Sequence, residues 1–360
     1  MGSSPHAGLP PAIICLNMQT LRLSAKDLDS IEQAAGIIRA GGLVAFPTET
    51  VYGLGGNALD EVAVTKIFMA KERPAWDPMI VHVSSREMLE SVIAKPPAQF
   101  DRLFAAFMPG PLTLVLPKKA TVPGVVTAAR ETVAVRFPAH PVAQRLIAAS
   151  GLPIAAPSAN RFGHVSPTTA EHALADLDGR IDAVLDGGRC GIGVESTVLD
   201  LTGEAPFILR QGAVTREQLQ LALGKIAAAD PAALSGPHEG LPSPGLMSRH
   251  YAPQTKLVLT EARERILAAA VQESPERKVG ALLPSGWNTC VAARFDWGRW
   301  GDWTTLASRL YVGLRWLDEQ KLDLIIAPLP PDKGLGSAIR ERLLKASGRE
   351  MCLAARGACR

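Results

Sequence analysis

Residues 28–58 read LDSIEQAAGIIRAGGLVAFPTETVYGLGGNA and decide the fold class. Apolar residues recur at helical spacing over 28–40, and Gly41 with Gly42 predicts the end of that helix. Residues 43–46 are continuously apolar, which predicts a short buried strand. A helix that leads directly into a buried strand is typical of α/β proteins.

The same alternation continues along the chain and predicts a sheet covered by helices. Further strands are expected at 79–83, 112–116, 132–137, 153–156 and 182–186, and further helices at 61–70, within 86–106 and at 141–149. Residues 196–201 and 207–212 are expected to pair antiparallel. The sheet should therefore be mixed rather than purely parallel.

The chain has 360 residues, more than a single hydrophobic core usually supports, so two domains are expected. Residues 235–253 (SGPHEGLPSPGLMSRHYAP) sustain neither helical nor strand periodicity, which predicts a linker. Beyond it, a smaller α/β unit is predicted, with strands at 256–259, 278–283 and 322–327 and helices at 261–272, 304–319 and 336–346. We therefore divide the chain into a tail with a first strand (1–27), a large domain (28–225), a linker that is also expected to act as a lid (226–254) and a C-terminal domain (255–360).

Composition excludes several protein classes. The net charge of +3 is too small to indicate general nucleic-acid binding, although a local basic hollow is compatible with it. The five cysteines are scattered without a zinc-binding spacing, so reduced thiols are expected. No secretory leader and no apolar run long enough to span a bilayer is found, which predicts a cytoplasmic protein.

Two segments offer polar groups where α/β proteins build ligand sites. Residues 47–58 (PTETVYGLGGNA) follow a buried strand with hydroxyl groups, a carboxylate and glycines, but they match neither a dinucleotide-binding nor a phosphate-loop motif, and an ordinary turn is the alternative. Ser158 and Asn160 follow the strand PIAAP, where they could bind a nucleotide or cap the next element.

Cationic residues suggest phosphate binding. Pro74 favours extended backbone before it, so Lys71 and Arg73 could project to one side as a clamp for phosphates. A solvated helix end is the alternative. Arg210 adds a third cation or is a surface charge, and His82, in the apolar strand MIVHV, is either a site residue or a core histidine.

Taken in order, the segments PTETVYGLG, KERP, DPMIVHV, PGPLTLVL, TVAVRFPAHP, PIAAPSAN, GVESTVLD and ILRQG resemble the YrdC-like family. The resemblance is strongest to its long two-domain members, the threonylcarbamoyl-AMP synthases, and it covers about residues 28–223. SPGLMSRHYAP and GLGSAIRERLLKASG resemble the linker and C-terminal domain of this long form. The resemblance implies a twisted mixed sheet with a concave basic face and a smaller Rossmann-like C-terminal domain.

The resemblance also implies an activity. Such enzymes make L-threonylcarbamoyl-AMP from L-threonine, bicarbonate and ATP, with Mg²⁺ and release of pyrophosphate, for threonylcarbamoyl modification of adenosine in tRNA. A tRNA-modifying threonylcarbamoyl transferase complex is the partner it implies.

Site residues follow from the same resemblance. The residues implied for ATP are Lys71, Arg73, Asp77, Ser158, Asn160, Ser166, Arg210 and Tyr251, with Lys71 and Arg73 also catalytic. Those implied for threonine are Thr50, His82, Thr132, Arg136 and Ser196. No metal-ligating residue is implied. The chain departs from the family's pattern at Asp77, where Asn is frequent, and at Ser248, where an aromatic residue is common.

Two other functions remain open. The basic hollow could bind RNA weakly, or the chain could be a scaffold in a tRNA-modification complex. A carbamoyl-adenylate-forming maturation factor for hydrogenases shares the YrdC-like domain, but the acylphosphatase and zinc-finger-like regions expected of it are missing from this sequence.

Overall fold

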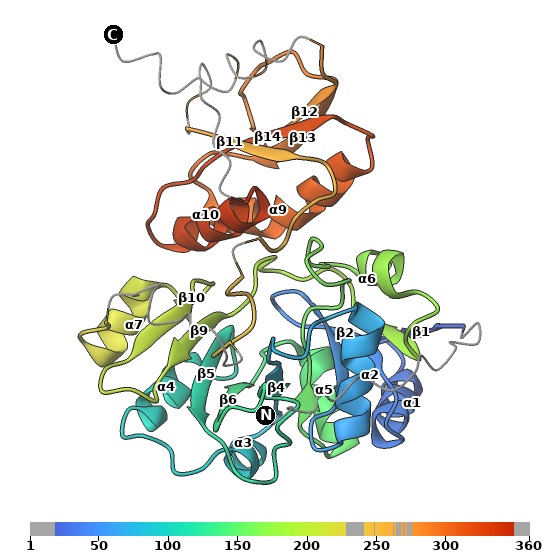
Figure 1. Ribbon diagram of the computed structural model, residues 1–360, viewed down its shortest axis with the longest axis vertical. Coiled ribbons are helices and arrows are strands. Elements are labelled where there is room, and N and C mark those ends of the chain that lie inside the picture. The colour runs from blue at the N-terminus through green and yellow to red at the C-terminus, as the bar shows by residue number, and fades with distance from the viewer. Residues whose placement is uncertain are drawn as a thin grey trace, which may run out of the picture.

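The computed structural model describes residues 19–227, 241–247, 249–261, 263, 268, 271 and 276–348. These residues form two sheets stacked along the long axis of the molecule (Figure 1). We call residues 19–227 the N-terminal unit, 241–254 the connecting segment and 255–348 the C-terminal unit. Among the described residues, no helix has the length and apolar character needed to cross a lipid bilayer.

The N-terminal unit contains a ten-stranded mixed sheet, as the sequence predicted. Its strands are β1 (Leu21–Ser24), β2 (Val44–Pro47), β3 (Tyr52–Asn57), β4 (Ile80–His82), β5 (Leu112–Pro117), β6 (Thr132–Arg136), β7 (Ile154–Ala155), β8 (Ala183–Asp186), β9 (Thr197–Asp200) and β10 (Phe207–Arg210). They are ordered β1-β8-β2-β3-β7-β4-β6-β5-β9-β10. The antiparallel pairing predicted near residues 196–212 is confirmed in β9 and β10.

Seven helices of the N-terminal unit pack around this sheet. They are α1 (Leu28–Arg39), α2 (Glu61–Lys71), α3 (Arg86–Val92), α4 (Phe100–Phe107), α5 (Pro141–Ser150), α6 (Ala170–Leu177) and α7 (Arg216–Leu223). In α1 the side chain of Asp27 caps the first turn, and Ile31, Ala34 and Ile38 form the buried stripe. The helical spacing in the sequence correctly predicted this helix.

The glycine-rich segment after β2 is a strand rather than the loop that the sequence suggested. β3 pairs antiparallel with β2, with Gly55 opposite Val44. A Cβ atom at Gly55 would lie 2.7 Å from the Phe46 ring and 2.8 Å from Ile154. Gly55 is therefore needed because neighbouring side chains approach the backbone closely.

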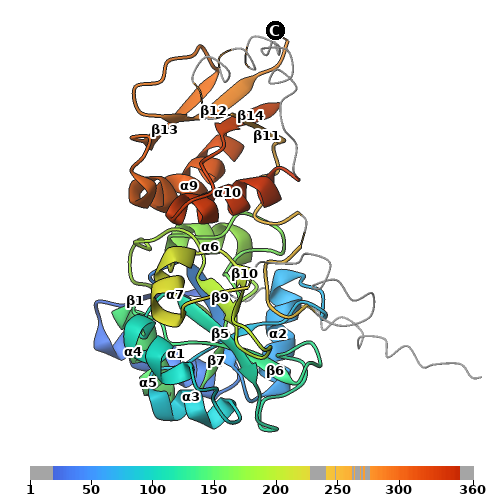
Figure 2. The same ribbon diagram turned by 90° about the vertical axis from the view of Figure 1, so that its left-hand side faces the viewer.

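The C-terminal unit is a parallel four-stranded sheet with two described helices on the side that faces the N-terminal unit (Figures 1 and 2). Its elements are β11 (Leu257–Thr260), β12 (Val279–Pro284), β13 (Ala293–Gly298), α9 (Trp303–Asp318), β14 (Leu324–Pro328) and α10 (Leu335–Ala346). The sequence did not predict β13, α6 or α7, and most of the predicted helix 261–272 lies outside the described residues.

The two units share a continuous apolar core. Val51 and Val194 of the N-terminal unit belong to the same buried cluster as Leu306, Tyr311 and Ile339 of the C-terminal unit. Because burial of apolar surface drives association, this core fixes α9 and α10 against the N-terminal unit.

Candidate active site

A buried pocket lies where the strand ends of the N-terminal unit meet the connecting segment. Its wall is formed by Thr48, Thr50, Val51, Gly53, Arg73, Ile80, His82, Arg136, Ala156, Pro157, Ser158, Glu195, Ser196, Arg210, Pro244, Gly245, His250 and Tyr251. Eight residues implied for substrates by the resemblance, Thr50, Arg73, His82, Arg136, Ser158, Ser196, Arg210 and Tyr251, are therefore brought together around one cavity. The cavity volume is about 50 Å³, far below the several hundred Å³ of pockets that hold whole ligands.

Three guanidinium groups give the pocket a positive wall. Arg73, Arg136 and Arg210 come from three separate parts of the chain, and all three are buried. The only acidic residue in the pocket wall, among the described residues, is Glu195. Such an excess of positive charge at low solvent exposure favours anionic ligands.

Arg73 is held by the backbone and by one carboxylate. Its Nε donates to the carbonyl oxygen of Asp77 at 3.0 Å, and its Nη2 donates to the carbonyl oxygen of Pro78 at 2.6 Å. Nη2 also lies 3.0 Å from Oδ2 of Asp77. These contacts fix the guanidinium plane, which lies 5.9 Å from the centre of the Phe162 ring.

Pro74 suggested that Lys71 and Arg73 project to one side of an extended chain, but the backbone between them is not extended. Lys71 is the last residue of α2, and Glu72 ends the helix in the left-handed conformation with φ of 55°. The Lys71 Nζ donates to the carbonyl oxygens of Ser158 and Asn160 rather than entering the pocket wall. Burial, together with the nearby Arg73, lowers the pKa of Lys71 well below its usual value.

Arg136 connects a hydroxyl and a carboxylate beside the β2–β3 turn. Its Nη1 donates to Oγ1 of Thr50 at 2.9 Å, and its Nη2 lies 2.7 Å from Oε1 of Glu49. Burial raises the pKa of Glu49, but the charge of Arg136 outweighs that effect together with hydrogen bonds, so the net pKa is lowered. Arg136 and Thr50 can therefore act together as a cation and a hydroxyl toward one ligand group.

Ser196 and Arg210 form a second polar pair in the pocket wall. Arg210 donates through Nε to the carbonyl oxygen of Ser196 and through Nη2 to its Oγ, each at 3.1 Å. The Ser196 hydroxyl also lies 2.8 Å from Oγ1 of Thr113. This network orients the Ser196 hydroxyl.

His82 is both a core histidine and a pocket residue, the two alternatives that the sequence left open. It is buried at the end of β4 and also lines the pocket. Its Nδ1 lies 3.2 Å from the carbonyl oxygen of Ile80. Burial and the nearby Arg136 lower the pKa of His82 to about 3, so the ring is neutral near pH 7.

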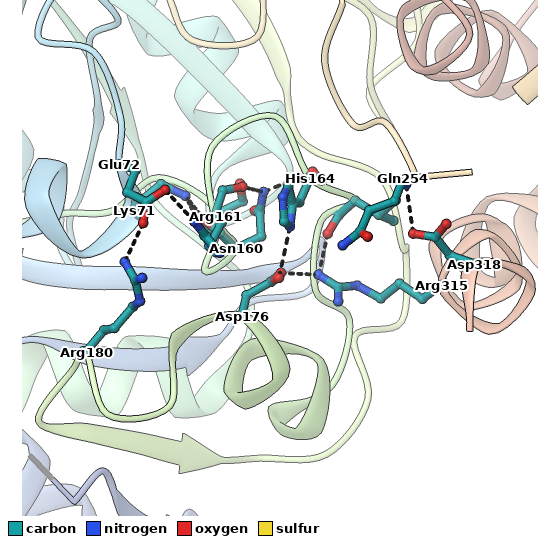
Figure 3. Close-up of polar contacts among 12 residues, drawn as sticks. Lys71, Glu72, Asn160, Arg161, His164, Asp176, Arg180, Gln254, Arg315 and Asp318 are labelled. Atoms are coloured by element: carbon teal, nitrogen blue, oxygen red, sulfur yellow. Dashed lines mark hydrogen bonds and ion pairs between the residues drawn. The ribbon is translucent and has the colours of Figure 1, made fainter. Parts of the chain in front are cut away.

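The Ser-Ala-Asn turn is connected to the C-terminal unit. The side-chain amide of Asn160 donates to the carbonyl oxygens of Arg161 and His164, so Asn160 orders the turn from outside the pocket. Figure 3 shows Asp176 between His164 and Arg315, with its carboxylate 3.1 Å from His164 Nδ1 and 2.6 Å from Arg315 Nη2.

Besides Lys71 and Asn160, three residues of the implied substrate sets, Asp77, Thr132 and Ser166, are not in the pocket wall. Asp77 is buried and pairs with Arg73, and Ser166 donates to Glu195 at 2.5 Å. Thr132 begins β6, and Arg136 ends it. A strand rises about 3.3 Å per residue, so the backbones of these two residues are roughly 13 Å apart. Thr132 therefore lies outside this cavity, and its implied contact with threonine stays a prediction.

Sequence reasoning missed Glu195, which lies in the pocket wall. Glu195 lies inside the quoted segment GVEST, but its partners, Tyr311 and Arg342, are more than one hundred residues away in the sequence. Only the three-dimensional packing brings these residues together. Ser248, a departure from the family's pattern, lies outside the described residues.

No metal centre is formed by the residues described. Among them, no group of three or more His, Cys, Asp or Glu side chains is arranged to hold a metal ion. The polar groups of the pocket include three guanidinium groups and several hydroxyls, which bind phosphate and carboxylate.

Comparisons with known proteins agree with this geometry. The family described as "Telomere recombination" matches residues 36–212, and the family described as "Threonylcarbamoyl-AMP synthase, C-terminal domain" matches residues 214–348. The chain is 46% identical to a threonylcarbamoyl-AMP synthase of Bacillus subtilis, over 91% of this chain and 96% of the relative.

A solved structure is also similar over nearly its whole length. The Sua5 protein of Pyrococcus abyssi, solved in complex with L-threonine, superimposes with a TM-score of 0.86 at 43% identity, covering 92% of this chain and 98% of that chain. A threonylcarbamoyl-AMP synthase of Schizosaccharomyces pombe is 37% identical over 88% of each chain.

Proposed function

Because the chain belongs to the two-domain threonylcarbamoyl-AMP synthases, we propose that it makes threonylcarbamoyl-AMP in the pocket lined by Arg73, Arg136 and Arg210. The substrates are L-threonine, bicarbonate and ATP, and the product serves threonylcarbamoyl modification of adenosine in tRNA. The observation that carries this assignment is the convergence of three buried guanidinium groups on one pocket, because two of the three substrates carry a net negative charge.

The threonine subsite lies at Arg136. Its guanidinium and the Thr50 hydroxyl, 2.9 Å apart, match the two oxygens of an amino-acid carboxylate. The Ser196 hydroxyl and neutral His82 line the same cavity and can accept or donate hydrogen bonds to the threonine side chain or to the carbamate.

The ATP subsite lies at Arg73, Ser158 and Arg210, with Tyr251 of the connecting segment nearby. Lys71 supports this subsite through its two backbone contacts to the Ser-Ala-Asn turn. The described residues offer no carboxylate cluster, so Mg²⁺ would enter bound mainly to the phosphate oxygens of ATP, as it does in many sites.

The reaction needs alignment rather than a protein nucleophile. The threonine amine and bicarbonate give a carbamate and water; a carbamate oxygen then bonds to the α-phosphorus as the bond to the β-phosphate oxygen breaks, and pyrophosphate leaves. Arg73 and Arg210 stabilise charge on the phosphates in this step. The resulting mixed anhydride is sensitive to water.

The connecting segment acts as a lid over this site. Pro244, Gly245, His250 and Tyr251 line the pocket, and the cavity of about 50 Å³ cannot accommodate ATP until they move. We place the domain boundaries at residues 225 and 255, so that the lid is the linker between domains. The released product would pass to a tRNA-modifying threonylcarbamoyl transferase complex.

The test is pyrophosphate release by the purified protein with ATP and Mg²⁺, with threonine and bicarbonate each omitted in turn. Release that requires both supports the assignment. Release without either, or steep salt-dependent RNA binding by a protein that releases no pyrophosphate, would overturn it in favour of ATP hydrolysis or RNA binding.

A further inference from the structure

A carboxylate in the pocket wall is bound by residues of the C-terminal unit. Oε2 of Glu195 accepts hydrogen bonds from Nε of Arg342 at 2.6 Å and from the Tyr311 hydroxyl at 2.9 Å. Its Oε1 accepts from the Ser166 hydroxyl at 2.5 Å. Since both carboxylate oxygens are engaged, Glu195 is a structural and electrostatic part of the wall and not a free base.

Arg342 is the centre of this connection. Its side chain, in α10, is fully buried, and its Nη2 donates to the carbonyl oxygen of Gln211 at 2.9 Å. Its guanidinium carbon lies 5.0 Å from the centre of the Tyr251 ring, a cation–π contact. One side chain of the C-terminal unit thus touches Glu195 in the pocket wall and Tyr251 in the connecting segment.

The packing around this connection leaves little room for adjustment. Gly193 has φ of +80°, and a Cβ atom there would lie 2.5 Å from Cα of Ser308 in α9. The Tyr251 ring also stacks on Tyr311, with centroids 6.0 Å apart and an interplanar angle of 30°. The segment from Gly193 to Ser196 is therefore seated directly on the C-terminal unit.

We propose that Arg342 is a positioning residue for the adenylation reaction: from the C-terminal unit it orients Glu195 and Tyr251 and neutralises the Glu195 charge beside the anionic substrates. This inference rests on the proposed function. It assigns to the C-terminal unit a part in substrate affinity, because Arg342 of α10 holds Glu195, a residue of the pocket wall.

Charge explains why the loss of Arg342 would weaken substrate binding. The charged or titratable groups that face Glu195 are Arg342, Arg210, Tyr311, Tyr251 and His250. Burial raises the pKa of Glu195, but Arg342 and Arg210 outweigh that effect and lower it to about 2. Without Arg342, the negative charge of the buried Glu195 carboxylate would be less well neutralised and would repel the anionic groups of threonine and ATP. The pKa of Glu195 would also rise.

The experiment compares four full-length proteins in the pyrophosphate assay: wild type, Arg342→Met, the double variant Arg342→Met with Glu195→Gln, and Arg340→Met. The last is a matched control, because Arg340 lies on the same helix but donates to the carbonyl oxygen of Pro330, away from the pocket. KM and kcat for threonine and ATP are measured, and threonine binding is measured by calorimetry.

We expect Arg342→Met to raise KM for threonine and ATP by about tenfold or more, with a smaller change in kcat, as expected for a partner removed from a buried charge. Removing the Glu195 charge in the double variant should recover at least about threefold of that loss. The ratio of variant to wild-type KM should fall as the pH is lowered, because Glu195 without Arg342 becomes protonated at a higher pH than in the wild type. The Arg340→Met variant should match the wild type.

Three results would overturn the proposal: wild-type KM values in Arg342→Met, a double variant no better than the single one, or a pH-independent KM ratio. If Arg342→Met does not fold by circular dichroism, Arg342→Gln replaces it; Gln also removes the positive charge but keeps an N–H donor for Glu195, so an unchanged KM would contradict the proposal equally. A wild type without threonine-dependent pyrophosphate release would instead refute the proposed function.

Discussion

The guanidinium Nη2 of Arg73 lies 3.0 Å from Oδ2 of Asp77, and both side chains are almost completely shielded from water. Burial raises the pKa of Asp77, and the positive charges of Arg73 and Lys71 oppose that rise. The site therefore contains a carboxylate that competes with phosphate for the guanidinium of Arg73.

Replacement of Asp77 by Asn tests this competition. The amide keeps the size of the side chain and removes its charge, so Arg73 should attract the triphosphate more strongly. We expect Asp77→Asn to lower KM for ATP by about two- to fivefold with KM for threonine unchanged, measured by initial rates of pyrophosphate release. A raised KM for ATP would show that Asp77 orients Arg73 instead of competing for it.

Loss of the cations themselves should have the opposite effect. Arg73→Ala or Lys71→Ala should lose about 2 kcal/mol or more of transition-state stabilisation, roughly thirtyfold in kcat/KM for ATP. The control is Arg86→Ala, since Arg86 forms exposed ion pairs with Glu90 and Asp101. Wild-type turnover in both site variants would remove these residues from the mechanism.

Two variants of Tyr251 test whether the connecting segment keeps water away from the site. Its hydroxyl has no hydrogen-bond partner in the part of the chain that the structure describes, so Tyr251→Phe should retain nearly full activity. Tyr251→Ala should open the lid and release more pyrophosphate per molecule of threonylcarbamoyl-AMP recovered, by about threefold or more, because the anhydride hydrolyses. Equal yields from the two variants would argue against the lid.

His82 should make folding sensitive to acid. Its pKa is about 3 in the folded protein and about 6.5 when exposed, so the folded state binds fewer protons. The resulting stability is present above about pH 6.5 and is lost as pH falls toward about 3, by roughly 2–3 kcal/mol at about pH 4. Thermal unfolding should show a flatter acid limb for His82→Gln than for the wild type. Parallel pH curves for the two proteins would place the acid sensitivity elsewhere, for example at His250.

The sequence predicted the larger sheet and most of its helices because their periodicity is local. It failed where tertiary packing overrides local preference. The glycines of β3 suggested a loop, but the segment is a strand in which Gly55 is required by the close approach of Phe46 and Ile154. Glu72 is left-handed, so the backbone between Lys71 and Arg73 is not extended as Pro74 had indicated.

For the candidate site, too, the sequence indicated some residues and could not indicate others. Residues near strand ends, such as Arg136 and Ser196, lie in the pocket as the resemblance implied. Thr132 does not, because the register of β6 places it at the other end of the strand. Glu195 and Arg342 could not be paired from the sequence, since 147 residues separate them.

The most direct measurement of the central claim uses carbon-13 bicarbonate with unlabelled threonine and ATP, followed by mass spectrometry of the product. If the pocket forms threonylcarbamoyl-AMP, the product should carry one labelled carbon, and Arg136→Ala should abolish most of the labelled product at low threonine. An adenylate of threonine without the labelled carbon, or undiminished labelled product from Arg136→Ala at every threonine concentration, would contradict the account.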